Sequence, residues 1–346
     1  MYPMKFIISS SMKKRILTGI TTTGIPHIGN FFGAIKPAIE LSDSNDAESF
    51  LFLADLHAII KQNNHSAIED SVKNVALAWL SAGLNPDNSY FYRQSDIAEI
   101  SELAWILGCV TSKGLINRSH AYKAAVDQNK ANNLDDDKAI TMGLFSYPVL
   151  MAADILIFNA THVPVGSDQI QHLEMTRDIA GRFNHIYKDD LFNLPEAITN
   201  DDAKTIPGLD GRKMSKSYNN VIPFLCSEKE LQKGVMRIVT NSLEPGVKKD
   251  TKDCNLFTIY SSFASNDQID ALKKLYADGV GWGEAKKLVF NDLNAIIEPV
   301  RDRYFDLLQK PDYLNEVLHH GSSKVTPLAK ELLEKVRDLV GIKKIS

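Results

Sequence analysis

The chain has 346 residues, a formal net charge of −4, 44% hydrophobic and 24% charged residues. This is the balance of a globular protein of about two domains, at about 150 residues per domain. It excludes a protein that binds nucleic acid over a generally basic surface, so such contacts must come from local clusters such as Lys248, Lys249 and Lys252. Taken alone, those lysines are more typical of a solvated face.

The sequence also indicates where the protein works. No apolar run approaches the roughly 20 residues of a membrane-spanning helix, and the N-terminal residues lack the pattern of a signal peptide. The three cysteines, Cys109, Cys226 and Cys254, are odd in number and far apart. That spacing argues against a disulfide framework or a zinc site and favours a reducing compartment. We therefore expect a cytoplasmic protein with no membrane segment and no metal held by its own side chains.

Strand and helix patterns alternate through the first 220 residues. Short apolar runs predict strands at 15–18, 49–54, 89–92 and 162–165. Helices are predicted at 31–41, from a capping box at Ser66 to a stop at Gly83, through 97–122 and from about 169 to 184. This alternation predicts a doubly wound parallel sheet, which binds ligands at the carboxyl ends of its strands. Asp55, His57 and Gln94 follow such strands.

Two loops lead from a predicted strand into a helix, an arrangement that offers backbone N–H groups to an anion. The first runs from Gly19 to Pro26 and is followed by His27-Ile28-Gly29-Asn30. The second is Gly166-Ser167-Asp168-Gln169, in which Asp168 could accept hydrogen bonds from sugar hydroxyls. His172 and His185 have no second ligand at metal spacing, so we expect structural roles for both.

The loop Gly211-Arg212-Lys213-Met214-Ser215-Lys216-Ser217 brings two lysines and two serine hydroxyls together. Such a cluster is suited to binding a polyphosphate. Taken alone, the same residues would also be expected in a basic loop that is only solvated. Asp154 is the one carboxylate in the most apolar stretch, 141–158. Burying an ionised carboxylate without a partner is costly. Asp154 should therefore either pair with an internal donor or face a pocket and accept an N–H from a ligand.

After Asn220 the pattern is helical throughout. Helices are predicted at 228–239, 268–277, 283–293, 295–308 and 327–340, the last with Thr326 as N-cap and Pro327 as its first residue. We therefore expect a doubly wound (Rossmann-like) α/β domain at 13–220 and an all-helical domain at 221–346. The final helix is expected to pack back on the first domain.

The motifs His27-Ile28-Gly29-Asn30 and Lys213-Met214-Ser215-Lys216-Ser217 are separated by 213 − 27 = 186 residues. Together they resemble the HIGH and KMSKS signatures of class I aminoacyl-tRNA synthetases. The segments 147–156, 163–169 and 171–174 are similar to the bacterial type of tryptophanyl-tRNA synthetase, and the resemblance covers about 15–342. The chain departs from that family where Thr21-Thr22-Thr23 replaces a usual Gln-Pro-Ser and Ser167 a usual Glu.

The resemblance implies a role for each matching position. Asp154 would accept the indole N–H of tryptophan. The wall and amino-group contacts of the tryptophan pocket would be Tyr147, Met151, His57, Val163, Val165 and Gln169. ATP would be bound by Thr21, Thr22, Thr23, Gly29, Asn30, Gly166, Ser167, Asp168, Ile206, Lys213, Met214, Ser215, Lys216 and Ser217. The catalytic residues would be His27, Lys123, Lys213 and Lys216.

The implied reaction is the ATP-dependent activation of L-tryptophan to tryptophanyl-adenylate, followed by transfer to tRNA(Trp). Catalysis would consist of positioning and of charge stabilisation on the departing pyrophosphate, with His27, the lysines and Mg²⁺ held by the ATP phosphates supplying positive charge. The resemblance also implies a homodimer whose helical domain binds the anticodon. A tyrosine-specific synthetase and a catalytically silent RNA-binding relative are the alternatives; the intact lysines and Asp154 argue against the silent one.

Overall fold

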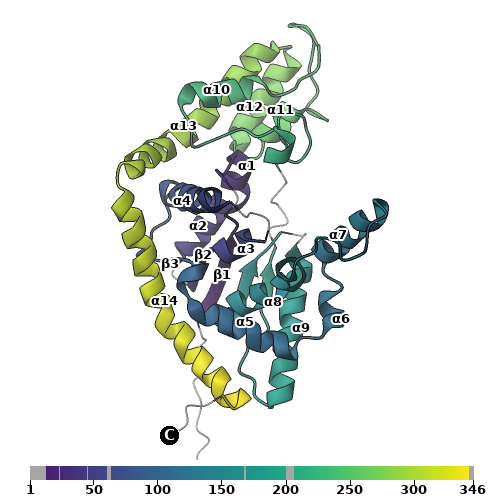
Figure 1. Ribbon diagram of the computed structural model, residues 1–346. Coiled ribbons are helices and arrows are strands. Elements are labelled where there is room, and N and C mark those ends of the chain that lie inside the picture. Colours follow the sequence, from purple (N-terminus) through teal and green to yellow (C-terminus); the bar gives the residue numbers. More distant parts are fainter. Residues whose placement is uncertain are drawn as a thin grey trace, which may run out of the picture.

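The computed structural model describes residues 13–22, 24–44, 46–60, 64–166, 169–199 and 206–342. Its centre is a parallel sheet of five strands in the order β3-β2-β1-β4-β5 (Figure 1). The strands are β1 Lys14–Ile20, β2 Ala47–Leu53, β3 Tyr90–Arg93, β4 His162–Pro164 and β5 Glu196–Ile198. The order reverses between β1 and β4, which is where a doubly wound sheet opens a crevice for ligands. The predicted fold class is confirmed, and β5 is a strand that the sequence did not predict.

Alternate residues of β1, β2 and β3 enter two different cores, because successive side chains of a strand point to opposite faces. On β2, Leu51 and Leu53 pack with the helices on one face, whereas Phe50 and Phe52 pack with those on the other. Both faces of the sheet are therefore buried, which explains why the strands read as continuous apolar runs.

The helices of the sheet domain connect these strands. They are α1 Ile28–Asn30, α2 Lys36–Ser42, α3 Asp55–Ala58, α4 His65–Ser81, α5 Ala98–Val110, α6 Lys113–Ile116, α7 His120–Ala131, α8 Met142–Leu156 and α9 Ile170–Tyr187, with a π-helical turn at Phe31–Ile35. The predicted cap of α4 was wrong. Asn64 is the N-cap and its side chain accepts from the Ala67 N–H at 3.3 Å, while Ser66 lies within the first turn. Asn caps a helix at least as well as Ser, so Asn64 can take the N-cap position, two residues before the predicted cap.

The C-terminal part is built from helices α10 Glu228–Met236, α11 Asn255–Tyr260, α12 Asn266–Ala277, α13 Trp282–Leu308 and α14 Pro311–Val340. The two helices predicted at 283–293 and 295–308 are one helix, α13. The predicted start of the last helix at Thr326–Pro327 was also wrong, because α14 is continuous over 30 residues. Proline has no N–H, so Pro327 leaves the carbonyl of Ser323 without its helical hydrogen bond. Both residues are exposed, so water can donate to that carbonyl instead.

Helix α14 runs down the side of the sheet domain and covers its β3 edge (Figure 1). Its buried residues Val325, Ala329 and Leu333 join the core formed with α5 and α8. At its C-terminal end the Arg337 guanidinium makes a two-pronged ion pair with Glu102 of α5, at 2.6 and 2.5 Å. Helix α13 packs against α4, where Arg303 Nε donates to the carbonyl of Ser81 at 2.6 Å.

Lys249 departs from the expected solvated face. It is 2% exposed, and its ammonium donates to the backbone carbonyls of Glu244 and Val247 at 3.1 and 2.9 Å while lying over the Trp282 ring. It therefore closes a loop rather than offering charge to a partner. Among the described residues, no helix is both long and apolar enough to cross a membrane.

Candidate active site

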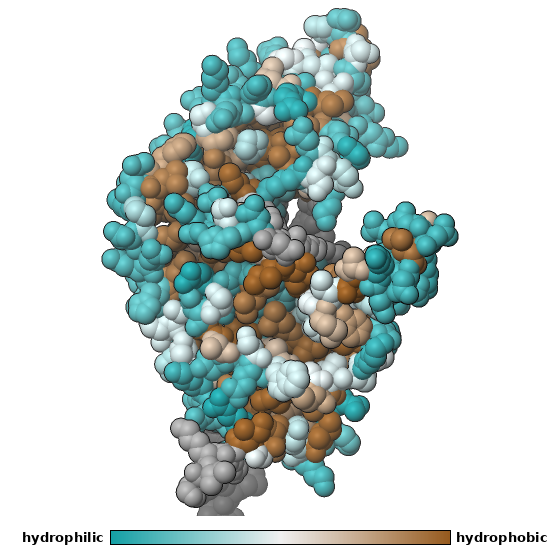
Figure 2. Space-filling view, viewed as in Figure 1, coloured by the Kyte–Doolittle hydropathy of each residue, from teal (hydrophilic) through white to brown (hydrophobic). Residues whose placement is uncertain are grey.

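A cavity of about 1070 Å³ opens at the carboxyl ends of β1, β2 and β4. Figure 2 shows this face hollowed between the helical domain and the projecting helix α7, with hydrophobic residues gathered in its centre. Most of the residues predicted to bind tryptophan or ATP line it. They are Thr21, Thr22, Asn30, His57, Tyr147, Met151, Asp154, Val163, Val165, Gly166, Gln169, Lys213 and Lys216.

The remaining predicted residues divide into two groups. Thr23, Ser167 and Asp168 lie outside the described residues. His27, Gly29, Lys123, Ile206, Met214, Ser215 and Ser217 are described but are not part of the lining. Lys123 is exposed on α7, two residues after the lining residue Ala121. Helix α7 buries none of its residues and projects from the body of the molecule (Figure 1).

Asp154 satisfies both of the alternatives that the sequence left open. It lies on α8, is 1% exposed, and lines the cavity. It also has internal partners, because Gln94 Nε2 donates to its two oxygens at 2.8 and 2.9 Å and His57 Nε2 lies 3.0 Å from Oδ2. Burial raises the pKa of this carboxyl, and the bonds from His57 and Gln94 act in the opposite direction.

A second polar chain crosses the same end of the cavity. The Tyr147 hydroxyl lies 2.6 Å from His172 Nε2, and His172 Nδ1 lies 3.0 Å from Gln169 Oε1. An amide oxygen only accepts, so Nδ1 carries the proton and Nε2 accepts from the tyrosine. His172, 4% exposed, therefore fixes two lining residues relative to each other. The sequence correctly predicted a structural role for it but not these partners.

The two family motifs meet at the other end of the cavity. A Cβ on Gly24 would lie 2.8 Å from Lys216 Nζ, which places the two loops side by side, and the φ of +65° at Gly24 favours glycine there. A Cβ on Gly29 would lie 3.0 Å from the His27 ring and 3.4 Å from Met214 Sδ. Met214 is buried and holds the lysine loop against the first helix. The 186 residues between the motifs thus fold back to bring them into contact.

The electrostatics of this end correct one expectation. Burial, together with the nearby Lys216 charge, lowers the pKa of His27 from 6.5 to about 4. His27 is therefore neutral near pH 7 and can donate a hydrogen bond but supplies no positive charge. Partial burial also lowers the pKa of Lys216. The positive charge at this end comes from Lys213 and Lys216.

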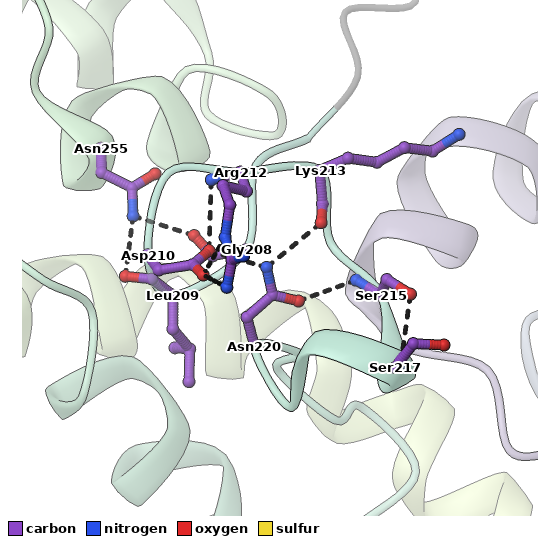
Figure 3. A network of polar contacts seen from close by, with 9 residues as sticks. All are labelled: Gly208, Leu209, Asp210, Arg212, Lys213, Ser215, Ser217, Asn220 and Asn255. Carbon is purple, nitrogen blue, oxygen red and sulfur yellow. Dashed lines mark hydrogen bonds and ion pairs between the residues drawn. The ribbon is translucent and has the colours of Figure 1, made fainter. Parts of the chain in front are cut away.

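The lysine loop is held by the buried side chain of Asn220, shown in Figure 3. Asn220 Oδ1 accepts from the Ser215 N–H at 2.8 Å, and Nδ2 donates to the Lys213 carbonyl at 3.1 Å and to Asp210 at 2.7 Å. The Lys213 side chain points away from this network (Figure 3). One amide therefore fixes the backbone on both sides of Met214 and leaves the Lys213 ammonium available.

The chain is similar to known proteins over nearly its whole length. The family model for class I tRNA synthetases (W and Y) matches residues 10–298. A tryptophan–tRNA ligase of Neisseria meningitidis is 53% identical over 96% of this chain and 98% of its own length. One of Xanthomonas axonopodis is 52% identical over 97% of this chain and 78% of its own length.

A solved tryptophanyl-tRNA synthetase of Campylobacter jejuni, complexed with ADP and tryptophan, is 40% identical and superposes with a TM-score of 0.84. The superposition covers 94% of this chain and 99% of that one. Because the family model spans most of the chain and relatives above 50% identity span nearly all of it, the chain belongs to the class I tRNA synthetases of the tryptophan and tyrosine (W and Y) family, among its tryptophan–tRNA ligases.

Proposed function

We propose that this protein is a tryptophan–tRNA ligase that joins L-tryptophan to tRNA(Trp) at the expense of ATP. One observation carries the proposal. A single cavity is lined by a buried carboxylate acceptor, Asp154, and by two lysines, Lys213 and Lys216. The first suits an amino acid with an N–H in its side chain, and the second suits a polyphosphate.

At the amino-acid end, Asp154 accepts the indole N–H. The apolar side chains of Met151, Val163 and Val165 line the same cavity and contact the ring. Tyr147 and Gln169, which His172 holds together, bind the α-amino group. Phenylalanine is rejected because it would desolvate the carboxylate without pairing it, and an unpaired buried acceptor is costly.

At the nucleotide end, ATP lies against the first loop and the lysine loop. The residues that contact the nucleotide are Thr21, Thr22, Gly29, Asn30, Gly166 and Ile206. For three further ATP contacts, Thr23, Ser167 and Asp168, the only support is the resemblance to the family. His27 donates to a phosphate oxygen as a neutral imidazole. Met214, Ser215 and Ser217 position the loop, and Lys123 reaches the phosphates from α7.

The chemistry needs no protein nucleophile. A carboxylate oxygen of tryptophan attacks the α-phosphorus of ATP, forming the acyl-phosphate bond of the adenylate as the bond to the pyrophosphate oxygen breaks. A hydroxyl of the terminal ribose of the tRNA then attacks the acyl carbon, and AMP leaves. Lys213 and Lys216 offset the charge that develops on the pyrophosphate. Mg²⁺ enters with ATP on its phosphate oxygens, the ligands that this hard cation prefers.

The rest of the molecule serves the tRNA and the assembly. We propose a division near residue 220, with the helical domain at 221–346 binding the anticodon. We also propose a homodimer formed through α5. Its exposed residues are Ala98, Ser101, Trp105, Gly108 and Cys109, and the neighbouring carboxylate of Glu102 is paired with Arg337. The side chain of Trp105 is 75% exposed, an unusual position for so large an apolar group. The cytoplasmic location stays a prediction.

Pyrophosphate exchange into ATP tests the specificity. With tryptophan, tyrosine and phenylalanine supplied separately, we expect exchange with tryptophan and at least about 100-fold less with the other two. Tyrosine-dependent exchange would assign the protein to the tyrosine branch. Absence of exchange with every amino acid, in protein that binds ATP, would refute the proposed activity.

A further inference from the structure

Gln94 is hydrogen-bonded to the carboxylate of Asp154. It follows directly after β3, at the carboxyl end of that strand, and it is 0% exposed. It is not among the residues that line the cavity. Any effect of Gln94 on a ligand therefore passes through the groups it contacts, the Asp154 carboxylate and the backbone of α3 at Leu56.

The geometry allows only one orientation of the Gln94 amide. Its Oε1 accepts from the Leu56 N–H at 3.1 Å, while Nε2 donates to Asp154 Oδ1 and Oδ2 at 2.8 and 2.9 Å. A flipped amide would point its NH₂ group at an N–H and its oxygen at a carboxylate, and both contacts would be repulsive. The backbone of α3 thus sets the direction in which Gln94 donates.

The same short helix supplies the second support. His57 follows Leu56 and lies 3.0 Å from Asp154 Oδ2 through Nε2. Two donors from two strand ends therefore fix the plane of the carboxylate. Asp154 still lines the cavity, so its remaining acceptor directions are available to a ligand.

We propose that Gln94 is a positioning residue for amino-acid selection, which aims the Asp154 carboxylate at the side-chain N–H of the substrate. This inference rests on the proposed function, because it takes Asp154 as the indole acceptor. Gln94 also favours the ionised form of Asp154, since its two contacts are donors and burial alone would favour the neutral acid. A neutral acid would be a weaker acceptor for an N–H.

The test is a pair of ligands that differ in one atom. Tryptophan and 3-benzothienylalanine have nearly the same shape, but the second has sulfur in place of the indole N–H. Dissociation constants for both are measured by calorimetry on the wild type and on Gln94→Met, a change of similar volume that removes the amide. We expect Gln94→Met to weaken tryptophan about 10- to 100-fold, as for loss of a hydrogen bond to a charged group. The analogue should change less than about threefold, and so should ATP.

The matched control is Tyr92→Phe. Tyr92 is fully buried near Asp154, and its hydroxyl has no hydrogen-bond partner among the described residues. Its removal should leave both ligands unchanged. Equal weakening of tryptophan and analogue by Gln94→Met would show that Gln94 only maintains the pocket, which would overturn the proposal. Failure of the wild type to bind tryptophan would instead refute the proposed function, so the two failures are distinguishable.

Gln94→Glu provides a second test that does not depend on the stability of the Met variant. Two adjacent carboxylates share one proton near neutrality, and the introduced side chain, while protonated, can still donate to Asp154. Above the upper apparent pKa of the pair both carboxylates are ionised and repel each other. Among the described residues, the other titratable groups that face Asp154 are His57 and Asp55 on α3 and Tyr92 on β3, and Tyr147 of α8 lines the same cavity. All are shared with the wild type.

The ratio of tryptophan dissociation constants, variant to wild type, should therefore rise between pH 6 and 9. A ratio that stays constant over this range would contradict the positioning role.

Discussion

At the scale of single residues, the cavity separates two kinds of polar group. Asp154 is a buried carboxyl group held by Gln94 and His57, whereas His27 is kept neutral by burial and by Lys216. The cavity therefore offers a carboxyl oxygen to a ligand N–H and the lysine side chains to phosphate. Substitutions at each end should affect one substrate and spare the other.

Asp154→Asn keeps the size of the side chain and removes the charge-assisted hydrogen bond, which is worth about 1.5–3 kcal/mol. We expect roughly 10- to 150-fold weaker tryptophan binding, at about 1.4 kcal/mol per tenfold, with little change for ATP. Calorimetry with each ligand, beside a melting curve, checks this. A less stable variant with an unchanged tryptophan constant would show that Asp154 has only a structural role.

Replacing Lys213 or Lys216 by Ala should lower the rate of pyrophosphate exchange by roughly 100-fold or more. Tryptophan binding should change little, because the lysines act on charge that develops in the transition state. Single-turnover rates and tryptophan titration measure the two quantities. Lys273→Ala, an exposed lysine paired with Asp270 on α12, is the control that should affect neither. Equal losses of rate and tryptophan affinity would show that the lysines act only in binding.

The pKa of His27 makes a prediction about stability. Below pH 6.5 the unfolded chain binds a proton on this imidazole, whereas the folded protein binds it only near pH 4. Stability should therefore be full above pH 6.5 and be lost as pH falls toward 4. A pKa difference of one unit between the folded and unfolded chains corresponds to about 1.4 kcal/mol of stability. Solvent screening of this half-buried group reduces that figure, so the expected loss is about 1–3 kcal/mol. Urea unfolding of wild type and His27→Gln at pH 7, 5.5 and 4.5 tests this, and the variant should lose less. Identical pH slopes would mean that the pKa of His27 is the same in the folded and unfolded states.

At the scale of elements, α14 shows how one helix can complete a sheet domain from the far end of the chain. The helix lies so close to β3 that a Cβ on Gly321 would overlap the backbone carbonyl of Phe91. β3 is the first strand of the sheet order, so this contact covers an edge. The glycine sets the approach distance, and the Arg337–Glu102 pair fixes the C-terminal end of the helix.

Gly321→Ala should therefore destabilise the protein, although alanine is the better helix former by about 1 kcal/mol. The cost of moving α14 away from β3 is that of overpacking, about 1–3 kcal/mol, and should exceed the gain. The matched control is Gly181→Ala in α9, where an added Cβ meets nothing within 4 Å and stability should rise. Denaturant unfolding measures both, and a stabilised Gly321→Ala would show that the helix has room to shift.

At the scale of the whole molecule, the helical domain and the sheet domain share a continuous core. Buried residues of α13, including Ile297 and Val300, belong to the same cluster as Leu51 and Leu53 of the sheet. Helix α13 packs on α4, and α14 returns along β3 to α5. The part proposed to bind the anticodon is thus joined to the catalytic part by two long helices (Figure 1).

The α5 face gives a prediction about assembly. Trp105→Glu should convert a dimer into a monomer at micromolar concentration, because the charge would be buried in an apolar interface. Sedimentation velocity over a range of concentrations measures this. Phe305→Glu, which changes an exposed aromatic residue of α13, is the control that should remain dimeric. A wild type that is monomeric at all concentrations would refute the dimer, and a dimeric Trp105→Glu would move the interface elsewhere.

The sequence by itself determined the class of fold and the location of the chemistry. Apolar runs, glycine-bearing loops and the two motifs are local patterns, and parallel strands bring their carboxyl ends to one edge wherever the chain goes between them. The resemblance carried by those motifs assigned Asp154, Lys216 and Tyr147 to one site, and all three line the same cavity.

The tertiary structure alone decided the partners and the electrostatics. That Gln94 donates to Asp154, that His172 joins Tyr147 to Gln169, and that Asn220 holds the lysine loop depend on contacts between residues far apart in sequence. The neutrality of His27 and the burial of Lys249 depend on how many atoms surround each group, which no local pattern records. The predicted helix start at Pro327 failed for the same reason, since packing of α14 on the sheet outweighed the local signal for a new helix at Thr326–Pro327.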